Sequence, residues 1–203
     1  MTVLELVGPV PPYLIHHEVG HLFIGALLGY TRCAAISFAP GNPAELARAS
    51  FLHTQGNTEA GVIRALAGMV VQARLSEDSI SQPLRGITQN RQLFKSPEIL
   101  DPDSELRRSL THHGFSGDLE NRHGALTLAK NKMGDSEDKL LAFLSGMESE
   151  LHEMLSAYVL KQIQVISTDV DHWMNRTNLD ECNLAPPYHY NDAKAALAVA
   201  NLA

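Results

Sequence analysis

The feature that most constrains this chain is an apolar stretch over residues 13–28 that contains the motif H-E-x-x-H. A Pro-Pro pair precedes the stretch and Gly29 follows it, and these are typical signals for the beginning and the end of a helix. Residues four apart lie on the same face of a helix, so the motif places His17 and His21 one above the other. We therefore predict a helix over 13–28 that presents two imidazoles side by side.

Two neighbouring imidazoles at this spacing favour a zinc site, because imidazole nitrogen is a common zinc ligand. Glu18 projects about 100° away from His17 around the helix axis. A carboxylate in that position is suited to act as a general base on a water molecule without binding the metal itself. The motif therefore predicts His17 and His21 as metal ligands and Glu18 as the catalytic residue.

A catalytic zinc site needs a third protein ligand, and the sequence alone leaves its identity open. The extended pattern HExxHxxGxxH, which supplies a third histidine, does not continue after His21. The remaining candidates are Asp118, Glu120, His112, His113 and His123. Asp118 lies where a helix is expected to begin, and an aspartate there is equally well explained as an N-cap.

The rest of the chain is predicted to be mainly α-helical. Apolar and small residues without helix breakers predict a buried helix over 59–74, and a further helix over 118–133 ends at Gly134. Residues 137–175 carry an amphipathic stripe, which we interpret as one long helix or as a hairpin broken near Ser145-Gly146 or Ser167. A short strand or small sheet is expected near residues 32–39, followed by a Pro-Gly turn.

The length of 203 residues favours a single domain. Residues 76–113 are polar and contain three prolines, so we expect a surface insertion with a short helix. Residues 176–203 are expected to form a C-terminal tail with a short helix. Neither segment shows the composition of a linker between two domains.

The charge balance excludes some classes of partner. Lys and Arg total 16 against 23 Asp and Glu, a formal charge of −7, which argues against nucleic-acid binding. The longest apolar run, Leu22 to Tyr30, is about half of what a membrane span requires, so none is expected. The two cysteines form no CxxC and no secretion signal is visible, which favours a cytoplasmic location.

Four segments, taken in order, resemble the FtsH-type peptidase domain, the zinc protease half of the membrane AAA proteases. They are HEVGH with the following LLGY, the strand ISFAPG, the LAG of residues 66–68, and GFSGDL at residues 114–119. The resemblance covers residues 12–134 closely. It implies a helical zincin-like peptidase domain that cleaves internal peptide bonds, with Zn²⁺ bound by His17, His21 and Asp118 and with Glu18 as the base.

The chain also departs from that family. Gln72 replaces a glutamate of the family's LAG helix, so acidic support from that helix is expected to be lost. No GxxxxGK[ST] motif occurs, so we expect ATP-independent activity on unstructured polypeptides or small proteins, with a separate unfoldase or adaptor as a candidate partner. The family works as hexamers, so an oligomer is compatible with the resemblance.

Two other functions stay open at this point. A non-catalytic interaction protein would retain the peptidase scaffold with a structural zinc, and the missing ATPase motif together with the change at Gln72 motivates it. The intact Glu18 speaks against it, because a structural metal site needs no base. The other alternative is a zinc hydrolase that acts on a non-peptide bond. The strand near residues 36–39 either pairs with an extended substrate or only closes the domain.

Overall fold

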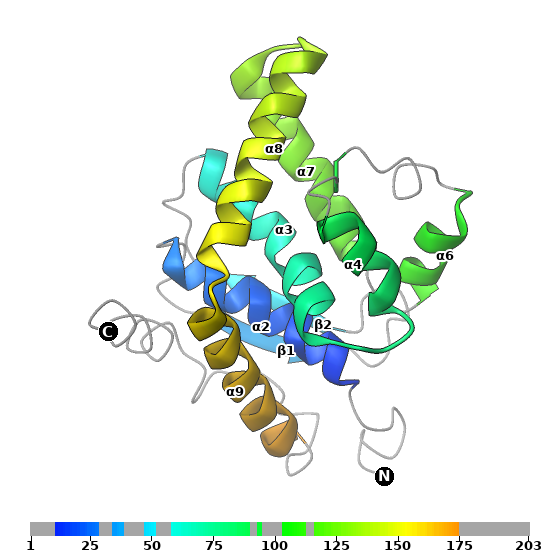
Figure 1. The fold of residues 1–203 in the computed structure, drawn as a ribbon, viewed down its shortest axis with the longest axis vertical. Helices are drawn as coiled ribbons and strands as arrows, with labels where there is room; N and C mark the ends of the chain where they lie inside the picture. Colours follow the sequence, from blue (N-terminus) through cyan, green and yellow to red (C-terminus); the bar gives the residue numbers. More distant parts are fainter. Residues whose placement is uncertain are drawn as a thin grey trace.

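The computed structural model describes residues 11–28, 34–38, 47–51, 58–89, 93–94, 103–112 and 116–174. Its elements are α2 (Pro12–Leu27), β1 (Ala34–Phe38), β2 (Ala47–Phe51), α3 (Thr58–Leu75), α4 (Ser81–Gln89), α6 (Glu105–His112), α7 (Ser116–Met133), α8 (Glu137–Met154) and α9 (Ala157–Met174). Helices make up most of this part of the chain, so the prediction of a mainly helical fold is confirmed (Figure 1).

Helices α2 and α3 pack along each other at the centre of the fold (Figure 1). Their close approach depends on Gly20, because a Cβ atom at this position would lie 2.8 Å from Val71 Cβ. Real Cβ atoms do not approach this closely, so the crossing requires glycine on α2. Both helices lie within two residues of their predicted ends.

Helices α7 and α8 form a hairpin that extends away from α2 and the sheet (Figure 1). Gly134 ends α7 as predicted, with a φ of +74° that glycine adopts at little cost. Near that end Lys132 forms an ion pair with Glu59 at the start of α3. The ion pair joins the end of α7 to the beginning of α3, so these two packed helices run antiparallel.

The amphipathic region 137–175 is divided at Leu155-Ser156, so both predicted break points are wrong. Ser156 Oγ accepts a hydrogen bond from the backbone N–H of Val159 at 3.3 Å and thereby caps α9. Ser167 lies inside α9, where its hydroxyl donates to the Ile163 carbonyl at 2.7 Å. Serine occurs at helix starts and inside helices, so the residue type alone does not locate the break.

The described parts of residues 76–113 contain two helices, α4 and α6, where a single short helix was expected. Helix α4 packs against α3, and Leu84 is fully buried between them. Leu93 and Phe94 are also buried and belong to the same core. Part of the expected surface insertion is therefore integral to the core.

Strands β1 and β2 form an antiparallel pair in which Ala34 lies opposite Phe51 and Phe38 opposite Ala47. Strand β1 lies inside the stretch predicted as a strand, and α2 packs against both strands. The expected turn at residues 40–43 and the C-terminal tail at 176–203 lie outside the described residues.

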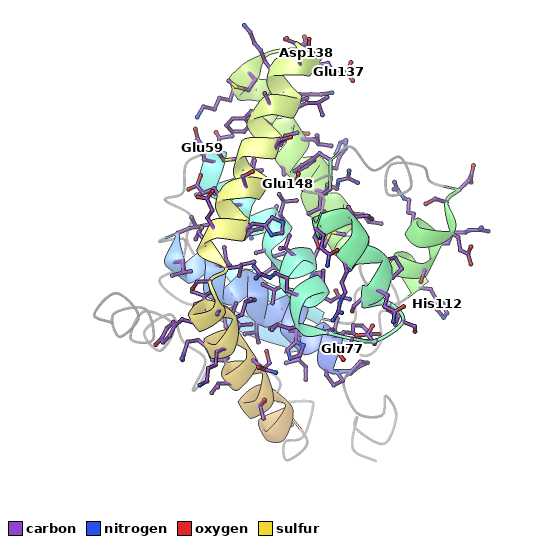
Figure 2. The ribbon with its side chains drawn as sticks, in the orientation of Figure 1. Glu59, Glu77, His112, Glu137, Asp138 and Glu148 are labelled. Carbon is purple, nitrogen blue, oxygen red and sulfur yellow. The ribbon has the colours of Figure 1, made fainter. Side chains whose placement is uncertain are left out.

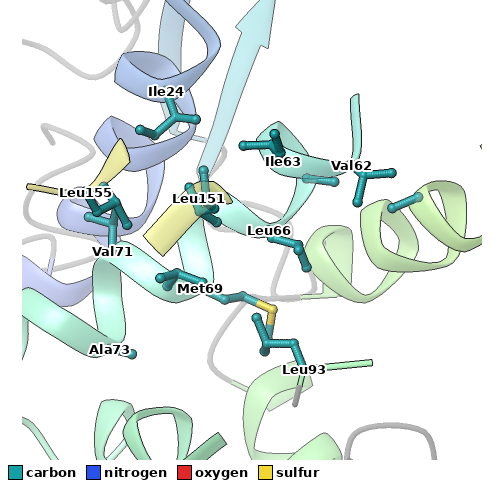
Figure 3. Packing of buried hydrophobic residues seen from close by; sticks show 14 of the residues in the cluster. Ile24, Val62, Ile63, Leu66, Met69, Val71, Ala73, Leu93, Leu151 and Leu155 are labelled. Atoms are coloured by element: carbon teal, nitrogen blue, oxygen red, sulfur yellow. The ribbon is translucent and has the colours of Figure 1, made fainter. Parts of the chain in front are cut away.

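One continuous hydrophobic core joins the helices, and α3 lies at its centre. Figure 3 shows Leu66 and Met69 of α3 packed near Leu93 and Leu151, which come from distant parts of the sequence. Burial of α3 on nearly all sides fixes its orientation, and thus the orientation of the groups it presents to α2. Within the described residues, no helix has the length and apolar character needed to cross a membrane.

Candidate metal centre

The two motif histidines lie side by side on α2 and are buried against α3. The exposed fraction is 0% for His17 and 5% for His21. Their ring centroids are 4.9 Å apart with an interplanar angle of 69°. The two Nε2 atoms are only 3.1 Å apart, so the predicted juxtaposition of the imidazoles is present.

Helix α3 supplies a hydrogen-bond partner for the other nitrogen of each ring. His21 Nδ1 is 2.8 Å from the carbonyl oxygen of Arg64, which can only accept a hydrogen bond. His17 Nδ1 is 2.8 Å from Oε1 of Gln72, whose Nε2 donates to Ser81 Oγ at 3.0 Å. Both imidazoles therefore carry a proton on Nδ1 and donate it to α3.

With the protons on Nδ1, both Nε2 atoms present lone pairs to each other. Two acceptors in contact repel unless a cation lies between or beside them, and that cation is either an additional proton or a metal ion. Two nitrogens bound to one tetrahedral zinc ion at 2.0–2.1 Å lie about 3.3–3.4 Å apart. The observed 3.1 Å is close to this separation, so the pair fits a common zinc ion.

Gly68 leaves open the space that faces both nitrogens. A Cβ atom at this position would lie 2.4 Å from His17 Nε2 and 2.4 Å from His21 Nε2. That point is nearly as close to both nitrogens as the roughly 2.0–2.1 Å of a zinc–nitrogen bond. The glycine of the predicted Leu-Ala-Gly segment therefore provides room where an ion bound by both histidines would lie.

Glu18 is also buried, with an exposed fraction of 5%. Burial of a carboxylate is costly, so its placement beside the histidines is consistent with a chemical role. At the beginning of α2, burial and then the charge of Asp78 raise the pKa of Tyr13. Burial lowers the pKa of His16, which the charge of Asp78 partly opposes. The negative charge of Asp78 thus affects the pKa of both Tyr13 and His16 near the start of α2.

The third ligand is not resolved by the described side chains. In the part of the chain that the structure describes, no group of three His, Cys, Asp or Glu side chains is close enough to hold a metal ion. His112 and His123 are exposed, and Figure 2 shows His112 at the outer edge of α6. Asp118 and Glu120 belong to the start of α7, but their side chains, like all of His113, lie outside the described residues.

Gln72 supports His17 although α3 supplies no acidic group at this position. Gln72 is fully buried and accepts the His17 hydrogen bond as a carboxylate would. The Gln72 amide nitrogen donates a hydrogen bond to Ser81 Oγ, and the Ser81 hydroxyl donates to Asp78 Oδ2 at 2.9 Å. An acidic group is therefore present, but it comes from the turn before α4.

Sequence reasoning missed both Ser81 and Asp78. The only local signal is an aspartate three residues before a serine at the start of a helix, which is typical of a cap. Asp78 Oδ1 does accept the backbone N–H groups of Ile80 and Ser81, at 3.0 and 2.8 Å. Nothing in the local pattern connects this cap to a histidine 55 residues before Gln72.

A cavity of about 620 Å³ lies between α3, α4 and α8 and is separate from the histidine pair. Its charged lining residues are Arg74, Glu77, Arg85 and His152. Arg74 already donates to the Leu155 carbonyl at 2.8 Å, and Arg85 donates to the Ser76 carbonyl at 2.6 Å. These guanidinium groups join neighbouring segments, so we do not assign this cavity a ligand.

A second buried polar cluster lies between α7 and α8. We call Arg122, Glu148 and the Leu93 backbone the arginine clamp. The Leu93 N–H donates to Glu148 Oε1 at 2.8 Å, and the Leu93 carbonyl accepts a hydrogen bond from Arg122 Nη2. Burial lowers the pKa of Arg122 to about 10, although Glu148 raises it. Figure 2 places Glu148 at the middle of α8, far from the hairpin tip marked by Glu137.

Comparison with known proteins assigns no family to this arrangement. No protein-family model matches the chain, and no curated protein or solved structure shows significant similarity to it. The functional argument therefore depends on the residues and their geometry.

Proposed function

We propose that this chain is a zinc-dependent metalloendopeptidase that acts without ATP. The observation that carries the proposal is the pair of Nε2 atoms, 3.1 Å apart and facing the open side of Gly68. Both histidines are buried, both hold their proton on the far nitrogen, and a buried glutamate follows the first of them. The resemblance to the FtsH-type peptidase domain adds the substrate class.

In this proposal His17, His21 and Asp118 hold the metal ion. Zinc at this position supplies a Lewis acid that polarises the scissile carbonyl group. Helix α7, which contains position 118, packs against α3, and this packing supports a carboxylate ligand from α7. Glu18 accepts the proton of the attacking water and transfers it to the leaving amine.

An extended substrate fits this arrangement better than a folded one. Strand β1 uses one edge to pair with β2, and its other edge has no strand partner among the described residues. A polypeptide laid along that edge would form backbone hydrogen bonds of the usual antiparallel or parallel kind. We therefore propose unstructured polypeptides or small proteins as substrates, delivered by diffusion or by a separate unfoldase or adaptor.

The alternative is a non-catalytic interaction protein with a structural zinc. Part of its motivation is the glutamine at position 72, where the FtsH-type family has a glutamate. The hydrogen bond from His17 to Gln72 weakens that motivation, because the glutamine retains the supporting contact. Glu18, the residue after His17, is buried, and a structural metal site needs no base.

The proposal is tested by zinc content and by cleavage of a fluorescently labelled unstructured polypeptide. We expect about one zinc per wild-type chain, and a clear loss of zinc in His17→Ala and Asp118→Ala. Glu18→Gln should retain zinc and fold but lose about 10²–10⁴-fold in cleavage rate, the usual contribution of a general base. His123→Ala is the matched control, because this exposed histidine on α7 should change neither quantity.

Absence of zinc from the folded wild-type protein would refute the proposal. Zinc binding with unchanged cleavage in Glu18→Gln would refute the assigned mechanism. Zinc binding with no cleavage of any polypeptide would favour the interaction protein. Full zinc occupancy in Asp118→Ala would retain the metal but exclude Asp118 as a ligand.

A further inference from the structure

We propose that Asp78 and Ser81 are positioning residues that, through Gln72, hold the His17 imidazole in its metal-binding tautomer. This inference rests on the proposed metal centre, but it concerns residues that neither the motif nor the resemblance includes. It assigns a function to the beginning of α4, which is otherwise explained as a helix start.

Four side chains form one continuous series of hydrogen bonds. His17 Nδ1 is 2.8 Å from Gln72 Oε1, Gln72 Nε2 is 3.0 Å from Ser81 Oγ, and Ser81 Oγ is 2.9 Å from Asp78 Oδ2. The first three residues are fully buried, with exposed fractions of 0%. Water therefore does not substitute for any of these partners, and each group depends on the next one in the series.

The carboxylate of Asp78 sets the direction of every bond in the series. A carboxylate can only accept, so the Ser81 hydroxyl must donate to Asp78 and keeps only its acceptor capacity for Gln72. Gln72 must then direct its NH₂ group to Ser81 and its carbonyl oxygen to His17. His17 in turn must carry its proton on Nδ1, which is the tautomer that can bind a metal ion through Nε2.

The orientation of Asp78 is itself fixed by the backbone. Its Oδ1 accepts the N–H groups of Ile80 and Ser81 at 3.0 and 2.8 Å, which leaves Oδ2 for the Ser81 hydroxyl. The two oxygens therefore have different tasks. One oxygen stabilises the start of α4, and the other ends the series that leads to His17.

The two histidines differ in how their tautomers are fixed. His21 donates to the backbone carbonyl of Arg64, and a backbone carbonyl can only accept. Its tautomer should therefore be insensitive to side-chain substitutions on α4. His17 depends on an amide that can turn around, so its tautomer needs the direction that Asp78 imposes. His21 thus serves as an internal control.

Asp78→Asn is the decisive substitution because it changes little besides direction. The backbone N–H groups of Ile80 and Ser81 still need an oxygen, so the new NH₂ group must occupy the place of Oδ2. It then donates to Ser81, whose hydroxyl loses the carboxylate that accepted its proton, so we expect the hydroxyl to donate to Gln72 and to reverse that amide. His17 would then accept on Nδ1 and carry its proton on Nε2, which weakens metal binding because that proton must first move.

The measurement is the ring-nitrogen tautomer of each histidine in the zinc-free full-length chain, from long-range proton–nitrogen NMR correlations. We expect Nδ1–H for both rings in the wild type, and a switch to Nε2–H for His17 alone in Asp78→Asn. The affinity for Zn²⁺, measured by competition with a chelator, should fall about 10–100-fold, as for other partners of metal-binding histidines. Asp138→Asn, an exposed carboxylate at the start of α8, is the matched control.

A rescue variant separates direction from simple structural damage. In Asp78→Asn combined with Gln72→Glu, the only carboxylate of the series moves next to His17. Glutamate at position 72 accepts from both His17 and Ser81, so His17 should regain the Nδ1–H tautomer and most of its zinc affinity. A purely structural role of Asp78 predicts no such recovery.

The outcomes distinguish this inference from the proposed function. An unchanged His17 tautomer and unchanged zinc affinity in Asp78→Asn would overturn the inference while leaving the metal centre intact. A tautomer switch in a chain that binds no zinc would support the inference and refute the proposed function. If Asp78→Asn fails to fold, Ser81→Ala interrupts the same series and leaves the Asp78 cap in place.

Discussion

The structure contains two buried polar clusters that differ in what they leave open. In the arginine clamp, a cation, an anion and both polar groups of the Leu93 backbone meet, and Arg122 also lies 5.5 Å from the centroid of the Phe94 ring. The histidine cluster is formed by His17, His21, Gln72 and Ser81. Each imidazole donates a hydrogen bond from Nδ1 to a group on α3, and the two Nε2 atoms face each other.

The two clusters differ in the charges that they contain. The clamp combines opposite charges around one peptide unit, so it contains its own counter-charges and serves to hold Leu93 against α7 and α8. In the proposed function, an external cation binds where the two Nε2 atoms of the histidine cluster meet.

The largest expected effect on zinc binding, a complete loss, comes from closing the open side of the histidine cluster. Gly68→Ala places a Cβ atom about where the ion would lie, 2.4 Å from both Nε2 atoms. We expect zinc binding to be lost and the free energy of unfolding to fall by about 1–3 kcal/mol from overpacking. Metal analysis and denaturant unfolding measure the two quantities. Full zinc occupancy in this variant would mean that the ion does not lie at Gly68.

The next effect tests the clamp. Glu148→Ala leaves the Arg122 guanidinium buried without its counter-charge, so we expect a loss of about 3–5 kcal/mol in the free energy of unfolding. Zinc affinity of the folded chain should stay as in the wild type, because the clamp does not contact the histidines. Glu150→Ala, an exposed glutamate on the same helix, should change stability by less than about 0.5 kcal/mol. A large loss of zinc affinity in Glu148→Ala would show that the arginine clamp and the histidine cluster are energetically coupled.

A double substitution separates the contribution of the two charges to stability from that of their hydrogen bonds to Leu93. In Arg122→Met with Glu148→Gln, both charges disappear while the glutamine oxygen still accepts the Leu93 N–H. We expect a loss of only about 1–2 kcal/mol, mainly for the hydrogen bond that the Leu93 carbonyl no longer receives. Chemical denaturation of the single and double variants measures it. A double variant less stable than Glu148→Ala would show that the charges themselves contribute net stability.

The smallest expected effect is a gain. A Cβ atom at Gly124 of α7 meets no atom within 4 Å, so Gly124→Ala adds no contact that could be strained. Lower entropy of the unfolded chain should raise stability by about 0.4–1 kcal/mol. This helical glycine is therefore also the control for Gly68→Ala in thermal unfolding. Destabilisation by Gly124→Ala would indicate a neighbour outside the described residues.

The sequence was sufficient for features that depend on local signals. Helix α2, helix α3 and the end of α7 were predicted because proline, glycine and uninterrupted apolar stretches mark them directly. The break between α8 and α9 was misplaced because neither Leu155 nor Ser156 is a helix breaker. It is stabilised by a distant residue, since the Arg74 side chain donates to the Leu155 carbonyl.

The same limit applies to the site. His17, Glu18 and His21 follow from spacing within one helix, and the spacing correctly predicts that the two imidazoles meet. The contribution of Gln72, Ser81 and Asp78 depends on the packing of α4 against α3, which no local pattern encodes. The direction of a hydrogen-bond series also depends on its last member, so Gln72 by itself does not reveal the contribution of Asp78.

The crossing at Gly20 has a consequence for the choice of metal ion. A Cβ atom there would lie 2.8 Å from Val71 Cβ, whereas ordinary contacts are 3.4–4 Å, so any side chain would push α2 and α3 apart. That separation also sets the room between the two imidazoles and Gly68. In the proposed centre a tight crossing suits an ion with bonds of about 2.0–2.1 Å and disfavours calcium, whose bonds of about 2.3–2.6 Å need more space. Gly20 provides no metal ligand, but in the proposed centre it would determine which ionic radius fits between α2 and α3.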